Sequence, residues 1–256
     1  MTAVEVSFAA LVGACVGSFL NVVVYRVPRG ESIMRPRSQC PVCGHPIRNL
    51  DNVPIVSWLV LQGRCRDCTA PISPRYVLIE AANAGLWVAA ALRFARIEEA
   101  AFVALTCSVL LALAFIDLEH RRLPNVIVLP AAAVAAVWIL VVAIGTSSFG
   151  IVRTGAIGGA SFFLFLFLVA LVSGGMGFGD VKLAGFIGLA TGRFGWECTV
   201  LAAFAAFFAG GTAGVLLLAT KRAGRKQAIP FGPAMAFGGI LALFLGTGPV
   251  RAWLGL

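Results

Sequence analysis

Two aspartate residues at the edges of long apolar runs have the type and setting needed for paired acid–base chemistry. Asp117 ends one apolar run, and Asp180 follows a glycine-rich stretch that includes Gly177 and Gly179 and leads into another apolar run. Ionisable residues at the edges of membrane helices are rare and mark functional sites, while glycines let backbones approach closely. We therefore predict that Asp117 and Asp180 form an intramembrane catalytic dyad supported by the two glycines.

The chemistry of such a dyad follows from the repulsion between two neighbouring carboxylates. Both cannot ionise easily, so one keeps a proton while the other stays charged. The charged member takes a proton from the water that attacks a peptide carbonyl, and the protonated member donates to the carbonyl oxygen. Glu119 and Lys182, each two residues beyond an aspartate, are candidates for tuning the dyad or for anchoring helix ends. A proton or cation transporter uses the same residue types, and the two aspartates alone leave both functions open.

The composition predicts that membrane helices position these aspartates. Hydrophobic residues make up 60% of the 256 residues, charged residues only 12%, and the mean hydropathy is +0.95. Such apolar runs are typical of an all-α polytopic membrane protein. We predict about eight transmembrane helices, the sixth of them short and rich in glycine: residues 5–24, 77–96, 99–116, 124–145, 152–173, 181–196, 199–220 and 229–248.

One polar segment interrupts the helices and divides the chain into three predicted parts. Residues 1–24 are the first transmembrane helix, residues 25–76 form a loop domain, and residues 77–256 form the membrane core with helices two to eight. Within the loop, the apolar run from Val53 to Leu61 is too short to span a bilayer.

The basic residues predict the orientation of the chain. The net charge is +9, and cytoplasmic loops of membrane proteins carry an excess of Lys and Arg. If the N-terminus is outside, the loop domain and both aspartates lie on the cytoplasmic side, and no nucleic-acid partner is needed to explain the charge. Only five of the 20 basic residues then remain outside: Arg93, Arg96, Arg153, Arg193 and Arg251.

Four cysteines in the loop have the spacing of a metal site. Cys40 and Cys43 form one Cys-x-x-Cys pair, and Cys65 and Cys68 form a second. Four thiolates at this spacing suit tetrahedral zinc in a structural role, because no position is left open for water. Disulfides and a redox pair are the alternatives, and a cytoplasmic location disfavours disulfides. We predict a zinc-ribbon-like loop whose folding depends on the metal.

Five ordered stretches resemble the prepilin peptidases, also called type IV leader peptidases, which are membrane aspartic proteases with a Gly-x-Gly-Asp motif. The resemblance covers nearly the whole chain, and one departure is Asn125, where the family often has Asp. The stretches are Gly17–Pro28, the two cysteine pairs with Ile72–Tyr76 and Glu80, Ile116–Asn125, Gly175–Leu183 and Ile229–Pro233.

The resemblance implies a specific function. Such enzymes cut a short basic leader from type IV prepilins and pseudopilins at the cytoplasmic face of the bacterial inner membrane. Members with a long, cysteine-bearing loop also methylate the new N-terminus with S-adenosylmethionine, so we expect both activities.

Family positions also suggest further site residues. Asn21, Arg26 and Glu80 are candidates for binding the methyl donor, with helix packing and loop anchoring as the alternative. Glu80 lies in an apolar run and needs a partner, for which Arg75 and a substrate amine are candidates. Acids such as Asp51 and Asp67 are candidates for meeting the basic leader.

Three other functions compete with this interpretation. The first is a Gly-x-Gly-Asp protease with other helical substrates, which the cysteine-rich loop disfavours. The second is a carboxylate-based ion transporter, which predicts ion flux without peptide cleavage. The third is a membrane scaffold, in which replacing both aspartates by Asn leaves function intact.

Overall fold

The described part of the chain is helical throughout its regular elements. The computed structural model describes residues 2–173, 176–220 and 230–246, and the extended pairing within these ranges is limited to two isolated bridges in the loop. The chain divides between Ala112 and Leu113 into two units, which are described in turn. The predicted division into residues 1–24, 25–76 and 77–256 is not tested by these two units and stays a prediction.

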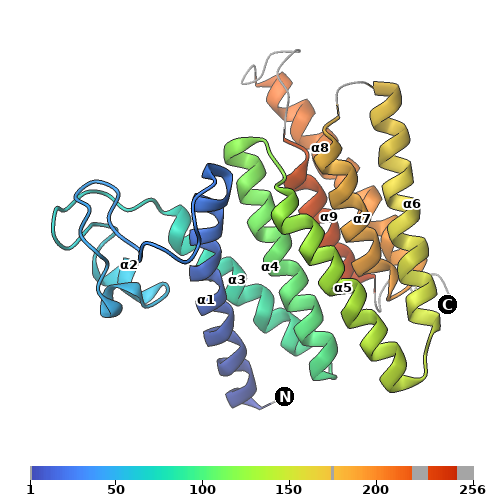
Figure 1. The fold of residues 1–256 in the computed structure, drawn as a ribbon, viewed down its shortest axis with the longest axis horizontal. Helices are drawn as coiled ribbons and strands as arrows, with labels where there is room; N and C mark the ends of the chain where they lie inside the picture. Colours follow the sequence, from blue (N-terminus) through green and yellow to red (C-terminus); the bar gives the residue numbers. More distant parts are fainter. Residues whose placement is uncertain (1, 174–175, 221–229, 247–256) are drawn as a thin grey trace. The chain divides into compact units, whose positions relative to one another are not determined.

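The first unit pairs two long helices on either side of the polar loop (Figure 1). These are α1 (Ala3–Arg26) and α3 (Arg75–Arg93). Glycines on α1 allow a close approach, because a Cβ atom added at Gly13 would lie 2.8 Å from Cβ of Trp87. The loop contains the short helices η1 (Val27–Arg29), η2 (Asn49–Asn52) and α2 (Val56–Val60).

A buried hydrogen-bond network joins three helices of this unit. The fully buried Asn83 of α3 donates to the carbonyl oxygen of Gly13 on α1 at 2.7 Å. It also accepts from Ser108 of α4 (Ile97–His120) at 2.8 Å, and Ser108 in turn accepts from Trp87 at 2.9 Å. Polar side chains that bond across helices in this way hold membrane bundles together.

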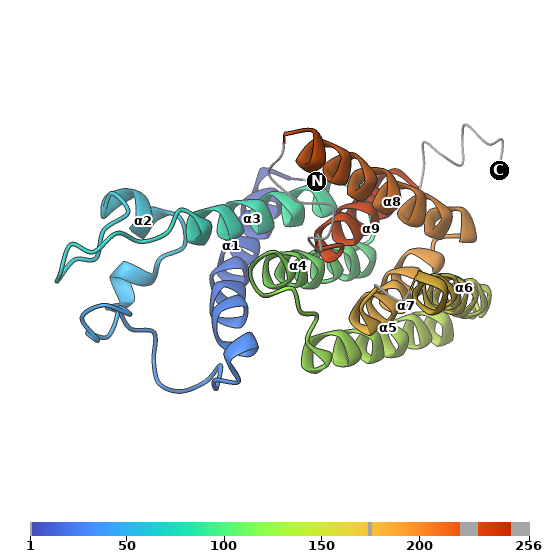
Figure 2. The ribbon, with the colours of Figure 1, turned by 90° about the horizontal axis from the view of Figure 1, so that it is seen from above.

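The second unit surrounds the helix that carries Asp180. It contains the end of α4 and the helices α5 (Asn125–Thr146), α6 (Gly150–Ser173), α7 (Phe178–Gly192), α8 (Trp196–Ala219) and α9 (Gly232–Leu245). Helix α7 packs against α5, α6, α8 and α9, and most of its residues beyond Lys182 are buried. Figure 2 shows α7 enclosed by these neighbours when the unit is seen from above.

Glycines bring the backbones of α6 and α7 into direct contact. A Cβ atom added at Gly188 would lie 2.2 Å from the carbonyl oxygen of Gly158, and one added at Gly158 would lie 2.5 Å from that of Gly188. Gly192, one turn further along α7, is also close to α6, because an added Cβ atom would lie 2.7 Å from the carbonyl oxygen of Thr154. Small residues four apart are the usual means of such close packing between membrane helices.

We expect Gly188→Ala to destabilise the second unit. The added methyl group has backbone atoms in its way, so α6 and α7 must separate, at a cost of about 1–3 kcal/mol. The measurement is the thermal midpoint of unfolding in detergent. Gly211→Ala on α8, where an added Cβ meets nothing within 4 Å, is the matched control, and an equal shift in both variants would contradict the packing argument.

Every predicted helix has a counterpart among the described residues, and in these ranges five helices are long and apolar enough to span a membrane. The five spans begin at Ala3, Ile97, Asn125, Gly150 and Trp196. The counterparts of the second, sixth and eighth predictions are α3, α7 and α9. The ends of the prediction 229–248, the cations between residues 221 and 226, and Arg251 lie outside the described residues. The chain is a polytopic membrane protein, and the number eight stays a prediction.

Candidate functional site

Asp117 and Asp180 lie at the same end of the second unit. Asp117 is in the last turn of α4, and Asp180 is in the first turn of α7. Figure 1 shows that α4 ends where α5, α7 and α9 begin. The two residues are close enough for the charge of Asp117 to act on Asp180. The fold thus brings together the two residues predicted to form the dyad.

The start of α9 binds the carboxylate of Asp117. The backbone N–H of Gly232, the first residue of α9, donates to Oδ2 of Asp117 at 2.8 Å. A helix N-terminus has free N–H groups and a partial positive charge, so it suits an anion. A Cβ atom added at Gly232 would lie 2.7 Å from this oxygen, so only glycine allows the contact. Gly232 lies in one of the stretches that resemble the family, but its residue type gave no sign of this role.

The two glycines of the Gly-x-Gly-Asp motif have different structural roles around Asp180. Gly177 is the N-cap of α7, and its backbone N–H faces the carboxylate of Asp180. Gly179 packs against the turn between α4 and α5, since an added Cβ would lie 3.0 Å from Cβ of Leu123. A larger residue at 179 would push the start of α7 away from that turn.

The other predicted supporting residues lie around the same end of the bundle. Lys182 donates to the side-chain oxygen of Asn125 at 3.0 Å and lies 5.0 Å from the ring centre of Phe178. This contact joins the starts of α5 and α7. Asn125, the residue at which the sequence departs from the expected family pattern, accepts this hydrogen bond with its amide oxygen. Glu119 is partly exposed, and its Oε2 lies 3.9 Å from Nε2 of His120.

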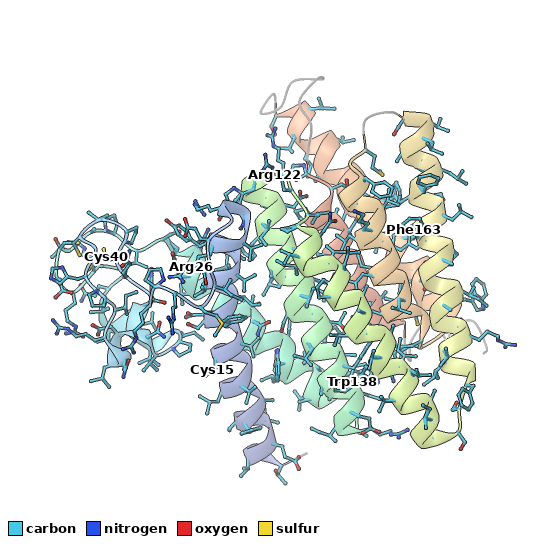
Figure 3. The ribbon with its side chains drawn as sticks, in the orientation of Figure 1. Cys15, Arg26, Cys40, Arg122, Trp138 and Phe163 are labelled. Atoms are coloured by element: carbon cyan, nitrogen blue, oxygen red, sulfur yellow. The ribbon has the colours of Figure 1, made fainter. Side chains whose placement is uncertain are left out.

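The four loop cysteines form one cluster. Their sulfur atoms all lie within 4.8 Å of one another, and those of Cys40 and Cys68 are 3.8 Å apart. Tetrahedral zinc with bonds of about 2.3 Å requires sulfur atoms about 3.8 Å apart. Figure 3 shows Cys40 within the loop, away from α1.

The two cysteine pairs are held by matching turns. The carbonyl oxygen of Cys40 accepts from the N–H of Gly44 at 2.9 Å, and that of Cys65 accepts from Thr69 at 2.9 Å. Gly44 and Thr69 both have positive φ angles, 72° and 58°. Each turn directs two sulfur atoms to one point, as the spacing predicted.

The electrostatics of the cluster favour a bound cation. The N–H groups of Cys43 and Val42 lower the pKa of Cys40 to about 6. At Cys68, the N–H of Ala70 favours the thiolate, but burial and the neighbouring sulfur atoms outweigh it and raise the pKa to about 12. The thiolate is therefore favoured at Cys40 and disfavoured at Cys68. A cation removes this conflict, because all four sulfur ligands bind it as thiolates.

We expect Cys40→Ser to release the metal. The wild type should carry about one zinc per chain, because a four-thiolate site binds zinc tightly, and the variant should carry less than about half as much. Elemental analysis of the purified protein measures this. Cys15→Ser is the control, since Cys15 lies exposed on α1 (Figure 3). Less than one zinc per two wild-type chains would contradict the site.

Ion pairs connect the second cysteine pair to the rest of the loop. Arg66 binds both carboxylate oxygens of Asp51, and Asp67 binds Arg48 at 3.0 Å. The hydrogen bond from Arg66 lowers the pKa of Asp51. Asp51 and Asp67, expected as candidates for meeting a basic leader, thus already have internal cationic partners.

The three candidates for the methyl-donor site make contacts that anchor the loop. Arg26 (Figure 3) donates to the carbonyl oxygens of Ser32 and Pro36. Asn21 donates to the carbonyl oxygen of Tyr76 at 3.0 Å and to Glu80 at 3.4 Å. Helix packing and loop anchoring account for these contacts, and methyl-donor binding stays a prediction.

Glu80 has partners that were not expected from the sequence. Its Oε2 accepts the backbone N–H of Ile55 at 2.7 Å, and Ser18 also contributes a hydrogen bond. Ile55 has φ 65°, an unfavourable value for a β-branched residue. A backbone donor carries no residue-type signal, which is why Arg75 or a substrate amine seemed the natural partners from the sequence.

Two family models match successive parts of this chain. Residues 11–94 match the bacterial peptidase A24 N-terminal domain, and residues 104–215 match the type IV leader peptidase family. No solved structure gives a significant match.

Three curated relatives match this chain over most of its length and carry the same name. A protein of Burkholderia pseudomallei (strain 1026b) is 34% identical over 96% of this chain and 87% of its own. A Pseudomonas aeruginosa protein is 36% identical over 95% of this chain and 91% of its own length. An Aeromonas hydrophila protein is 35% identical over 97% of this chain and 93% of its own length. Each is named "Prepilin leader peptidase/N-methyltransferase". Together with the membrane helices and the cysteine cluster, this similarity shows that the chain is a multi-pass inner-membrane enzyme of the type IV leader peptidase family.

Proposed function

We propose that this enzyme cleaves the basic leader from type IV prepilins and pseudopilins with Asp117 and Asp180 as a catalytic dyad. The observation that supports the proposal is the placement of Asp117, at the end of α4, and of Asp180, at the start of α7, at the same end of the second unit. The names of the relatives supply the substrate class.

The contacts around the dyad suggest how the two carboxylates work. The backbone N–H of Gly232 donates to Oδ2 of Asp117 and holds this carboxylate in place. A carboxylate has about four acceptor positions, so it can still accept from water or substrate. Asp180 is held in the first turn of α7 by Gly177. A water molecule between the carboxylates loses its proton to one of them while the other protonates the peptide carbonyl oxygen. Neither residue forms a covalent bond to the substrate.

The proposal includes a topology. All eight long helices cross the membrane, the N-terminus is outside, and the loop of residues 25–76 faces the cytoplasm with the dyad. The excess of basic residues in the predicted cytoplasmic loops supports this orientation. The scissile bond then lies at the cytoplasmic surface, while the apolar helix of the pilin stays in the bilayer.

The proposal also includes zinc in the cysteine cluster and N-methylation of the product. Zinc bound to Cys40, Cys43, Cys65 and Cys68 would stabilise the fold of the loop, since four protein ligands leave no position for water. S-adenosylmethionine supplies an activated methyl group for the new N-terminal amine. The protein's task is to align that amine with the methyl group.

Cleavage of a purified prepilin in proteoliposomes tests both activities. We expect a mature pilin that lacks its leader and, with S-adenosylmethionine present, gains one methyl group at its N-terminus by mass spectrometry. Ion flux across the same proteoliposomes without peptide cleavage would support the transporter instead. Cleavage without any gain in mass would remove the methyltransferase part of the proposal alone.

A further inference from the structure

Helix α2 presents a group of exposed apolar side chains on the surface of the loop. Its inner side is fixed, because Ser57 is buried and Trp58 donates to the carbonyl oxygen of Ile72 at 3.2 Å. Its outer side carries Val56, Leu59 and Val60, which are 55%, 59% and 70% exposed. An aliphatic surface of this kind is typical of a contact site.

The segment around α2 also lacks uncompensated charge. Between Asn49 and Gly63 the sequence has one charged residue, Asp51. The guanidinium of Arg66 neutralises it by donating hydrogen bonds to both of its carboxylate oxygens. Leu50 and Val53 extend the exposed apolar surface toward η2. We call Leu50, Val53, Val56, Leu59 and Val60 the apolar surface of the loop.

The contact between Ile55 and Glu80 fixes the depth of this surface. Ile55 immediately precedes α2, and Glu80 lies five residues after the start of α3. Asn21, which binds Glu80, lies five residues before the end of α1. At 1.5 Å per residue, both positions are about 7.5 Å inside the helix ends. Figure 1 shows α2 alongside α1, not beyond its C-terminal end.

We propose that the apolar surface of the loop contacts the cytoplasmic leaflet of the membrane that α1 spans. Amphipathic segments that lie on membranes enter about 5–10 Å into the boundary between headgroups and acyl chains. This distance is similar to the span of about 7.5 Å by which the contact of Ile55 with Glu80 lies inside the helix ends. The exposed Arg64, just after this segment, suits anionic headgroups. The zinc loop is thus held against the bilayer on one side and tied to α1 and α3 on the other. The inference rests on the proposed topology and not on peptidase activity.

Photo-crosslinking tests the contact without using catalysis. The photoreactive residue p-benzoylphenylalanine replaces Leu59 in the full-length protein, reconstituted without prepilin in vesicles of phosphatidylethanolamine and phosphatidylglycerol. Val42, an exposed aliphatic residue between Cys40 and Cys43, is the matched control position. Lipid adducts are measured by mass spectrometry. We expect at least about five times more adduct at position 59 than at position 42, because only the former reaches the acyl chains.

Each other outcome overturns the proposal. Equal lipid adducts at the two positions would place α2 in water, and crosslinks to a second copy would assign the surface to a protein interface. Crosslinks that appear only after prepilin is added would make it a substrate-binding surface. Zinc content verifies that the loop is folded, and Val56 is the alternative probe position if the variant at 59 loses its metal. If prepilin is never cleaved while lipid adducts form at position 59, the proposed peptidase function fails and the membrane contact stands.

Discussion

Asp117→Asn and Asp180→Asn should each reduce prepilin cleavage by about 10²- to 10⁴-fold, the range expected for loss of a general acid or base. An asparagine in either position can neither take a proton from water nor donate one to a carbonyl oxygen. The measurement is the initial rate of leader release in proteoliposomes at saturating prepilin. Both variants should keep their zinc, because neither residue contributes to the loop. They should also keep their thermal midpoint of unfolding, because asparagine has nearly the shape of aspartate and keeps an acceptor oxygen for Gly232.

Glu99→Gln is the matched control for these variants. Glu99 lies in the first turn of α4, at the opposite end of the helix from Asp117, so the same loss of charge should leave cleavage unchanged. Cleavage at the normal rate by either aspartate variant would refute the dyad. Retained function after both aspartates are replaced would favour the scaffold, and retained ion flux would favour the transporter.

Gly232→Ala should reduce kcat for cleavage by about 10²-fold, the loss expected when a catalytic group moves by about 1 Å. The new methyl group would lie 2.7 Å from Oδ2 of Asp117 and 3.0 Å from its Cβ and Cγ atoms. The carboxylate must move, and the hydrogen bond from the start of α9 is lost or lengthened. KM for prepilin should change by less than about threefold, since the contact acts on the catalytic carboxylate and not on bound substrate.

Gly238→Ala separates this effect from a general loosening of α9. A Cβ atom added at Gly238 would lie 2.4 Å from the carbonyl oxygen of Ala202 on α8, so the variant disturbs the same helix away from Asp117. We expect it to lower the thermal midpoint of unfolding with a smaller loss of kcat than Gly232→Ala. An equal loss of kcat in both variants would mean that Gly232 only packs the helix.

The sequence predicted those features that residue type and spacing encode. Hydropathy located the long helices, and the alternation of their directions placed Asp117 and Asp180 at one end of the bundle. The spacing of the four cysteines predicted their cluster, which the structure contains. Helix ends were less well placed, since α7 begins at Phe178 and not at residue 181. The charge of Asp180 ends the apolar run in the hydropathy pattern, but the backbone from Phe178 to Asp180 is already helical.

The features that escaped prediction depend on backbone groups. Gly232 binds Asp117 through an N–H group across 115 residues of sequence, and Ile55 binds Glu80 in the same way. Every residue other than proline carries such a donor, so residue type cannot reveal which one is used. Helix α2 escaped prediction because five residues are too few for a periodic pattern. Its position is set by Glu80 and by the packing of Trp58 against the loop.

The lengths of α7 and α9 have a consequence for the surroundings of the dyad. Helix α7 has 15 residues and α9 has 14, so each rises only about 22 Å, against a hydrocarbon core of about 30 Å. Since α5, α6, α8 and α9 pack around α7, its shortfall is met within the protein and not by lipid. Both short helices begin at the end where Asp117 lies, so we expect the shortfall at that end to leave the two carboxylates open to water. In the proposed topology, a leader from the cytoplasm would then reach Asp180 while the following pilin helix stays in the lipid.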